Sequence, residues 1–340
     1  ICAVYVRWTN HRKLIFRDRH SSTEGVVKGK IEDKVALEAS IQKAIDRSAK
    51  LSGVRPTRVI TNISFFGLEF VQNPGFILST SDTGQITYSE KIECIRRSKN
   101  IVKSDTQMIM HAVPLYYKVD GTKVGNPVDV FGRNLEVETH LILSSSDVIT
   151  AITSILKNLN FRIDGFIYDP IASSQVMLTL EERKKGVLFI DIGGSFTKIN
   201  IIQHNLLFQS HVVPIGGDTF TNDVAQCLET TFAEADRLKM VYGDVFLPRV
   251  SSEKEITLNT KNYGRISIKH EFLCQILSAR LKELMSFIHS YVATPKASFS
   301  SIVLGGGGAN ISGLLECFKR ESSIDVREGL PENVRGIVKI

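Results

Sequence analysis

The sequence predicts an α/β fold built as two lobes, and three observations support this fold class. Two short apolar strands each run into a glycine-rich turn, within residues 187–195 and 302–308. The order strand, helix, strand recurs in both halves of the chain, as it does in α/β architectures. A chain of 340 residues also exceeds what one compact core usually holds, so two or more domains are expected.

The first half of the chain begins with two strands and a helix. Apolar segments at 2–6 and 13–16, separated by a polar turn, predict a hairpin. A helix with one apolar stripe begins after Asp33 and ends at Gly53. A strand over 59–63 then completes a strand, helix, strand unit.

The next segment, 65–140, has a different character. A helix over 89–99 and strands over 109–117 and 135–143, joined by turn-rich connections, predict a small inserted α+β module. The α/β pattern resumes with a helix for which Asp147 is the expected N-cap.

The second half repeats the order of the first. After the strand that leads to Asp191, a second strand covers 198–202, and Gly216-Gly217-Asp218 opens a helix. A long amphipathic helix covers 272–292 and ends near Thr294-Pro295. A further helix is expected directly after the glycine run 305–308.

The two glycine turns are typical of phosphate-binding sites. Glycine has no Cβ, so backbone N–H groups can approach phosphate oxygens, and a helix that starts just beyond adds its positive end. The run 305–308 could also be a plain connection, but four glycines between a buried strand and a helix carry a large entropic cost. Nucleotide contact is therefore the favoured interpretation.

Three charged residues have two interpretations each. Asp191 ends its strand, where it could orient Mg²⁺ and its waters against phosphates or could bond to the backbone of its own turn. Asp236 and Lys239 are one helical turn apart, where they could grip a ribose or adenine edge. From their spacing alone, a surface ion pair is the commoner meaning.

Composition excludes several classes of protein. The formal charge of +6 comes from dispersed basic residues without interleaved aromatic platforms, so nucleic-acid binding is not expected. Five scattered cysteines without a C-x-x-C pair indicate reduced thiols in a cytoplasm. No apolar run reaches the roughly 20 residues that span a bilayer. The sequence also shows no phosphate-binding P-loop and no nucleophile triad motif.

These motifs together resemble the FtsA family of actin-like bacterial cell-division proteins. Residues 191–197 look like the second phosphate motif, 304–313 like the adenosine motif, and 216–223 like the family's helix entry. The insertion that distinguishes the family from actin is similar to four segments here, namely 111–114, 120–121, 126–128 and 135–140. The resemblance implies an actin-like (ribonuclease H-like) two-lobe fold with a small inserted α+β subdomain.

The resemblance also implies a division of the chain. Residues 1–64 and 141–185 would form the first lobe, with 65–140 inserted. Residues 186–224 and 299–340 would form the second lobe, and 225–298 its peripheral subdomain. The start at Ile1 and the stop at Ile340 suggest a fragment that lacks the first phosphate motif and the family's C-terminal membrane helix.

ATP and Mg²⁺ are the ligands that the resemblance implies, and it places Asp236 and Lys239 at the nucleoside. Asp191 would hold the Mg²⁺ through water. The residues expected to contact the nucleotide are Asp191, Gly193, Gly194, Ser195, Thr197, Gly216, Gly217, Asp236, Lys239, Gly306, Gly307 and Gly308. Lys198 stands where family members often carry an aspartate, which makes ATP hydrolysis less expected than ATP binding.

The implied role is a largely non-catalytic adaptor, at most a weak ATPase. It would bind ATP, assemble into filaments and tether FtsZ polymers to the cytoplasmic face of the inner membrane at the division septum. The C-terminal peptide of FtsZ would dock on 225–298, where Arg280 and Lys282 offer positive charge. Other division proteins would bind the inserted subdomain.

Two other functions stay open from sequence. The first is an actin-like component of pilus or secretion assembly, which shares a similar insertion. The second is a sugar-kinase-type phosphotransferase, which would need a catalytic aspartate that Ser195 and Lys198 do not supply.

Overall fold

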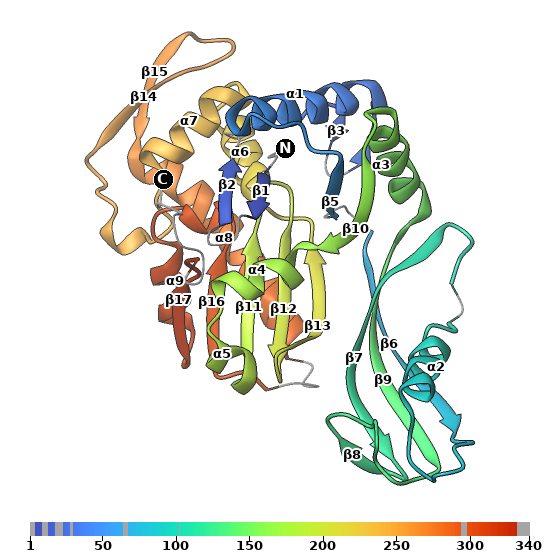
Figure 1. The fold of residues 1–340 in the computed structure, drawn as a ribbon. Helices are drawn as coiled ribbons and strands as arrows, with labels where there is room; N and C mark the ends of the chain where they lie inside the picture. The colour runs from blue at the N-terminus through green and yellow to red at the C-terminus, as the bar shows by residue number, and fades with distance from the viewer. Residues whose placement is uncertain are drawn as a thin grey trace. The chain divides into compact units, whose positions relative to one another are not determined.

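The computed structural model describes residues 4–8, 13–17, 23–27, 30–63, 67–101, 103–293 and 298–331. The chain divides into two compact units, residues 1–169 and 170–340, drawn in Figure 1 from blue to red along the chain.

The first unit contains the predicted hairpin and a layer of helices on a pair of parallel strands. Asp33 caps α1 by accepting hydrogen bonds from the Val35 and Ala36 N–H groups, and Gly53 ends it at φ 71°. Helices α1 and α3 bury their apolar faces together against β5 and β10, which run parallel. The elements are β1 (Val4–Trp8), β2 (Lys13–Arg17), β3 (Val26–Val27), β4 (Lys30–Ile31), α1 (Lys34–Ser52), β5 (Arg58–Ile63), α3 (Ser146–Asn158) and β10 (Arg162–Tyr168).

A four-stranded antiparallel sheet with one helix is inserted between β5 and α3. Its strand order is β6-β9-β7-β8, and α2 lies against β6 and β9 (Figure 1). The helix begins with a capping box in which Thr87 and Glu90 exchange hydrogen bonds. The elements are β6 (Glu69–Leu78), α2 (Tyr88–Ser98), β7 (Gln107–Val119), β8 (Thr122–Val124) and β9 (Asn134–Ser145).

A buried histidine lies where this inserted sheet meets the rest of the first unit. His140 on β9 stacks on Phe70, with ring centroids 5.9 Å apart, and neither of its ring nitrogens has a hydrogen-bond partner among the described residues. Burial lowers the pKa of His140 to about 4. The imidazole is therefore neutral in the folded protein near neutral pH.

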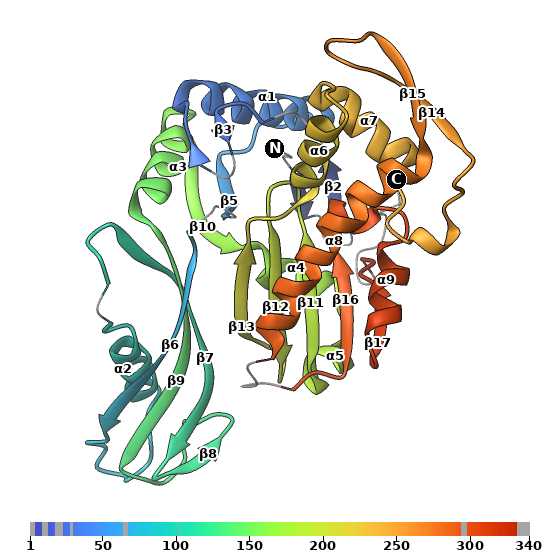
Figure 2. The same ribbon diagram turned by 180° about the vertical axis from the view of Figure 1, so that it is seen from behind.

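The second unit is a five-stranded mixed sheet of order β13-β12-β11-β16-β17 with helices on its faces. Strand β11 is central, antiparallel to β12 and parallel to β16. Helix α8 crosses one face of this sheet (Figure 2) and shares its core. The elements are α4 (Asp169–Met177), α5 (Leu180–Lys185), β11 (Val187–Ile192), β12 (Thr197–Gln203), β13 (Leu206–Val213), α6 (Gly217–Cys227), α7 (Phe232–Tyr242), η1 (Leu247–Arg249), β14 (Glu255–Asn259), β15 (Arg265–Lys269), α8 (His270–Val292), β16 (Ser301–Gly305), η2 (Gly307–Asn310), α9 (Leu314–Glu321) and β17 (Asp325–Glu328).

Strands β14 and β15 form a hairpin whose outer edge faces α7. Glu234 on α7 accepts a hydrogen bond from the Asn259 N–H at 3.2 Å, and Arg237 Nη2 lies 3.5 Å from the Thr257 carbonyl oxygen. The two α7 side chains also pair with each other at 2.7 Å. Side chains of α7 thus form hydrogen bonds with main-chain groups on the outer edge of β14.

Most predicted elements are confirmed, and two details were wrong. Asp147 does not cap α3: it lies in the first turn, the N-cap is Ser145, and no side chain supplies a capping bond. Nor does a helix follow the glycine run directly, because residues after Gly306 form the short η2 and α9 starts only after Gly313. Gly313 has φ 85°, and a Cβ there would fall 2.3 Å from Asp244 Oδ1, so this position requires glycine. The predicted helix end at Thr294-Pro295 lies outside the described residues.

Phe220 tests the core of the second unit, because this α6 side chain is fully buried in it. Phe220→Ala should lower the free energy of unfolding by about 3–5 kcal/mol, from lost transfer energy and a residual cavity. Phe232→Ala on α7, where the side chain is 46% exposed, is the matched control and should cost less than about 1 kcal/mol. Equal losses in urea titrations of the two variants would contradict this core assignment.

His140 predicts a pH dependence of stability. Its pKa is about 4 in the folded protein against an ordinary value of 6.5. Between these pH values the unfolded chain binds a proton that the folded chain does not. Above about pH 6.5, His140 is neutral in both states and does not destabilise the folded protein. As the pH falls from 6.5 to 4, protonation of the unfolded chain should lower the free energy of unfolding by up to about 3 kcal/mol. Urea titrations across this range measure it. His140→Phe keeps a ring on Phe70 and should flatten the profile, and an unchanged profile would exclude His140 as its source.

Candidate functional site

The two glycine turns lie side by side at one edge of the central sheet. Strands β11 and β16 are parallel and Asp191 is paired with Gly305, so both chains leave the sheet at the same end. A Cβ on Gly306 would fall 2.3 Å from the Ile192 carbonyl oxygen, and one on Gly308 would fall 2.4 Å from Ile192 Cγ2. Only glycine permits this backbone approach.

The start of α6 is tied to the first of these turns. The N–H groups of Gly217 and Asp218 donate to the carbonyls of Gly193 and Gly194 at 2.9 and 2.7 Å. A Cβ on Gly216 would lie 2.4 Å from the Gly194 carbonyl oxygen. The carbonyls of the turn thereby cap the helix, and the turn is held in one conformation.

This turn keeps main-chain donors available. The Gly193 N–H donates to the Phe196 carbonyl at 2.8 Å, which closes the turn. Within the described ranges, no hydrogen bond from the N–H groups of Gly194 or Ser195 is present. The Ser195 hydroxyl donates to Asp218 Oδ2 at 3.1 Å. Two adjacent free N–H groups form a surface suited to an anion.

Asp236 and Lys239 lie over the start of α6. The Lys239 ammonium donates to the Gly217 carbonyl at 3.1 Å and to the Thr221 hydroxyl at 2.6 Å, and pairs with Asp236 at 2.8 Å. Lys239 is nearly buried, whereas the Asp236 side chain is 48% exposed. Burial raises the pKa of Asp236, but the hydrogen bond and charge of Lys239 outweigh it and the pKa is lowered. The carboxylate therefore presents its free oxygen to solvent beside Gly217.

Asp191 and Lys198 face each other across β11 and β12. They are a register pair, and the Lys198 ammonium lies 3.4 Å from Asp191 Oδ2. Both side chains are largely buried. The carboxylate predicted to face a metal is thus engaged by a cation of the chain itself.

Thr197 has a structural role instead of a surface position. It is fully buried, and its hydroxyl donates to the Ile215 carbonyl at 2.7 Å. Its side chain is committed to holding β12 against the segment that enters α6.

Most residues of this candidate site were predicted from the sequence, but two of its side chains were not. Asp218 and Thr221 link the glycine turn, α6 and Lys239 through their hydrogen bonds. Both lie in the segment 216–223 that follows the second glycine pair, and their positions at the start of a helix were the available signal. Among the described residues, no three His, Cys, Asp or Glu side chains form a cluster suited to a metal ion.

Arg280 and Lys282 differ in their surroundings. Arg280 forks onto Asp223 of α6 at 2.6 and 2.8 Å and also contacts Glu283. The positive charge of Arg280 is thus paired within the protein, and the ion pair with Asp223 links α8 to α6. Lys282 is exposed and lines a groove between η1, α8 and α9 with a volume of about 570 Å³.

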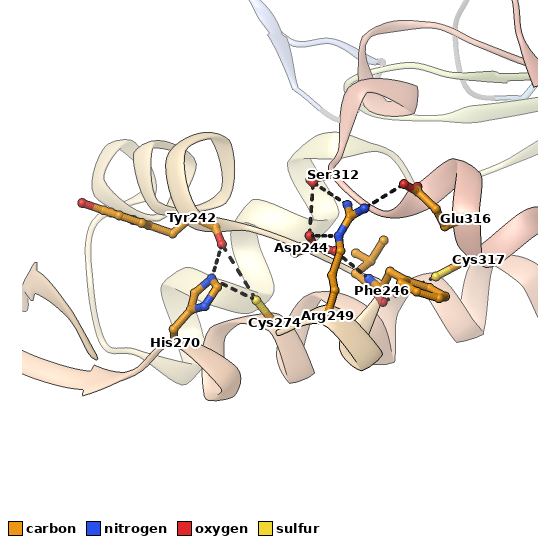
Figure 3. A network of polar contacts seen from close by, with 10 residues as sticks. Tyr242, Asp244, Phe246, Arg249, His270, Cys274, Ser312, Glu316 and Cys317 are labelled. Atoms are coloured by element: carbon orange, nitrogen blue, oxygen red, sulfur yellow. Dashed lines mark hydrogen bonds and ion pairs between the residues drawn. The ribbon is translucent and has the colours of Figure 1, made fainter. Parts of the chain in front are cut away.

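A polar network holds the walls of this groove in place (Figure 3). Arg249 on η1 bonds to Asp244 at 2.6 Å, to Glu316 of α9 at 2.7 Å and to the Ser312 hydroxyl at 2.8 Å. The Cys317 thiol donates to the Val245 carbonyl. The groove residues are Val245, Phe246, Leu247, Pro248, Ser278, Leu281, Lys282, Met285, Cys317, Arg320 and Glu321.

Two protein-family models match this chain. The model for cell division protein FtsA matches residues 188–339, and the model for the SHS2 domain inserted in FtsA matches residues 68–143. The chain belongs to the FtsA family. Among FtsA proteins, that of Buchnera aphidicola subsp. Acyrthosiphon pisum is 26% identical over 93% of this chain and 78% of its own. The FtsA protein of Escherichia coli K12 is 24% identical over 93% of this chain and 77% of its own length.

Solved structures share the actin-like fold. The PilM-PilN type IV pilus biogenesis complex matches with a TM-score of 0.67 and 14% identity, over 97% of this chain and 85% of the matched one. MreB5 of Spiroplasma citri bound to ADP matches with a TM-score of 0.56 and 13% identity, over 95% of this chain and 76% of the matched one. At these identities the likeness concerns the fold alone, so it adds nothing for the pilus alternative. In the described residues of this FtsA-family chain, no helix has both the length and the apolar character to cross a membrane.

Gly216 and Gly217 provide a matched test of the turn. A Cβ at Gly216 would meet the Gly194 carbonyl, whereas the nearest atoms to a Cβ at Gly217 are 3.8 Å away. Gly216→Ala should therefore lower the free energy of unfolding by about 2 kcal/mol or more, because backbone atoms must shift. Gly217→Ala should be neutral or slightly stabilising. Thermal unfolding of both variants measures this, and the reverse order would refute the close approach.

Proposed function

We propose that this FtsA-family chain binds ATP at the glycine turns of its second unit and works as an adaptor in cell division. The observation that carries the proposal is the convergence of three glycine segments and the Asp236–Lys239 pair at one edge of the central sheet. Free backbone donors, nearby ammonium groups and a hydrogen-bonding carboxylate match the phosphates and hydroxyls of a nucleotide.

Each part of the site has a role in the proposal. The N–H groups of Gly194 and Ser195 donate to phosphate oxygens, and the open space beside Gly307, where a Cβ would meet no atom within 4 Å, leaves room for the phosphates. Asp236 accepts from the ribose or adenine, and Lys239 fixes Asp236 in place. We do not extend the proposal to Mg²⁺ at Asp191, since Lys198 engages that carboxylate.

Membership in the FtsA family supports the adaptor role that we propose. Nucleotide-bound molecules assemble into filaments and connect FtsZ polymers to the cytoplasmic face of the inner membrane at the septum. Binding energy, without rapid turnover, suffices to shift the population toward an assembling state. The inserted subdomain provides the surface for other division proteins.

We place the FtsZ C-terminal peptide in the groove between η1, α8 and α9. Its floor is apolar, and exposed Lys282 and Arg320 stand at its rim. An acidic peptide with apolar anchors matches this combination. Arg280, bound to Asp223, supports the groove from behind as part of α8 instead of meeting the peptide.

ATP binding tests the central proposal. The full-length protein should bind ATP at micromolar concentration with little phosphate release, and filaments should appear in electron micrographs only with nucleotide. Asp236→Ala should weaken ATP binding by about 10-fold, through the loss of about 1.4 kcal/mol of hydrogen bonding. Phosphate release that a small hydroxylated compound strongly accelerates would point to a phosphotransferase instead.

Charge reversal tests the docking groove. Lys282→Glu should weaken binding of an FtsZ C-terminal peptide by about 5-fold or more without changing the melting temperature, because the side chain is exposed. Arg280→Glu is the contrasting variant and should lower the melting temperature, since it places an acid against Asp223. Full peptide affinity in Lys282→Glu and in Arg320→Glu would remove the groove from the proposal.

A further inference from the structure

We propose that the Lys198 ammonium, instead of a divalent cation, neutralises Asp191, so that this chain binds its nucleotide without requiring Mg²⁺. This inference rests on the nucleotide site proposed above and specifies which cation that site uses.

The pairing of Asp191 with Lys198 is built into the sheet. The two residues are directly opposite in the β11–β12 register, which places their side chains on the same face. The ammonium lies 3.4 Å from Asp191 Oδ2, and the side chains are only 9% and 15% exposed. At this low exposure, solvent and salt screen the attraction between the two charges only weakly.

The other oxygen of Asp191 is crowded by the second glycine turn. A Cβ on Gly306 would fall 2.5 Å from Asp191 Oδ1, so the backbone of the second glycine turn lies directly against that oxygen. A magnesium ion held through its hydration water needs one of these two oxygens to accept from the water. Lys198 meets one oxygen and Gly306 crowds the other.

Among the described residues, the other carboxylates near the turns do not provide an alternative metal site. Asp236 pairs with Lys239, and Asp218 accepts from Ser195. Mg²⁺ prefers carboxylates that are free to bind it or its waters in octahedral geometry. The donor set therefore does not fit a divalent cation, while two ammonium groups already supply positive charge beside the glycine turns.

Equilibrium binding of ATP to the full-length protein tests this inference. The titration is performed in excess magnesium chloride and in excess EDTA at equal ionic strength. The expected result is that the two dissociation constants differ by less than about threefold. Binding that is about tenfold tighter with magnesium would overturn the inference and leave the nucleotide site standing. No binding in either buffer would remove the nucleotide site itself.

Variants at Lys198 test whether this residue is the cause. Lys198→Asp sets two carboxylates opposite each other and should make ATP binding at least about tenfold weaker in EDTA than in magnesium. It should also bind Mn²⁺ without nucleotide, as measured by electron paramagnetic resonance, whereas the wild type should not. Lys198→Arg keeps the charge and should stay metal-independent.

Two further variants control for unrelated effects. Lys185→Asp changes the same charge at an exposed pair with Glu181 and should behave like the wild type. If Lys198→Asp does not fold, Lys198→Met removes the ammonium without adding a charge and should gain magnesium dependence. Metal-independent binding in a folded Lys198→Asp or Lys198→Met variant would overturn the assignment.

Discussion

The close approach of Gly216 and Gly217 to Gly193 and Gly194 is the constraint on which the second unit depends. Four main-chain groups join in two hydrogen bonds there, and a single Cβ at Gly216 would separate them. This contact fixes where α6 begins. Because α6 carries Thr221, it also fixes where Lys239 of α7 finds its partners. The site is thus a consequence of backbone packing before any side chain is considered.

Sequence patterns predicted those features that depend on local chemistry. Asp33 and Gly53 mark the ends of α1 because a carboxylate caps a helix and glycine tolerates positive φ. The glycine turns were visible because strands rarely end in repeated glycine without a close contact. The inserted module was visible from its alternating strands and turn residues.

Features that depend on distant partners were not predictable in this way. Arg280 is separated from Asp223 by more than fifty positions in sequence, so its engagement could not be read from the charge pattern of α8. The sequence pattern places Thr197 in a ligand-binding turn, yet its hydroxyl donates a hydrogen bond to the Ile215 carbonyl. Gly313, the N-cap of α9, lies so close to Asp244, a residue on another segment, that a Cβ would not fit there. In each case tertiary packing decides the role of a residue whose local pattern is ambiguous.

Two ion pairs occupy the candidate nucleotide site, at positions where unpaired charges could otherwise bind a ligand. Asp191 with Lys198 and Asp236 with Lys239 each combine a carboxylate with an ammonium of the same chain. Such pairs restrict the orientations of the side chains that form them.

The outer edge of β14 carries a consequence for assembly. Unprotected edge strands pair with the edges of neighbouring molecules, and proteins commonly block them with charged side chains. Here Glu234 and Arg237 reach from α7 to the main chain of Asn259 and Thr257. These contacts remove one route to irregular cross-β aggregation, because they engage main-chain groups that another strand could otherwise pair with. Another molecule that approaches this edge of the hairpin meets the side chains of Glu234 and Arg237 before it meets the main chain of β14.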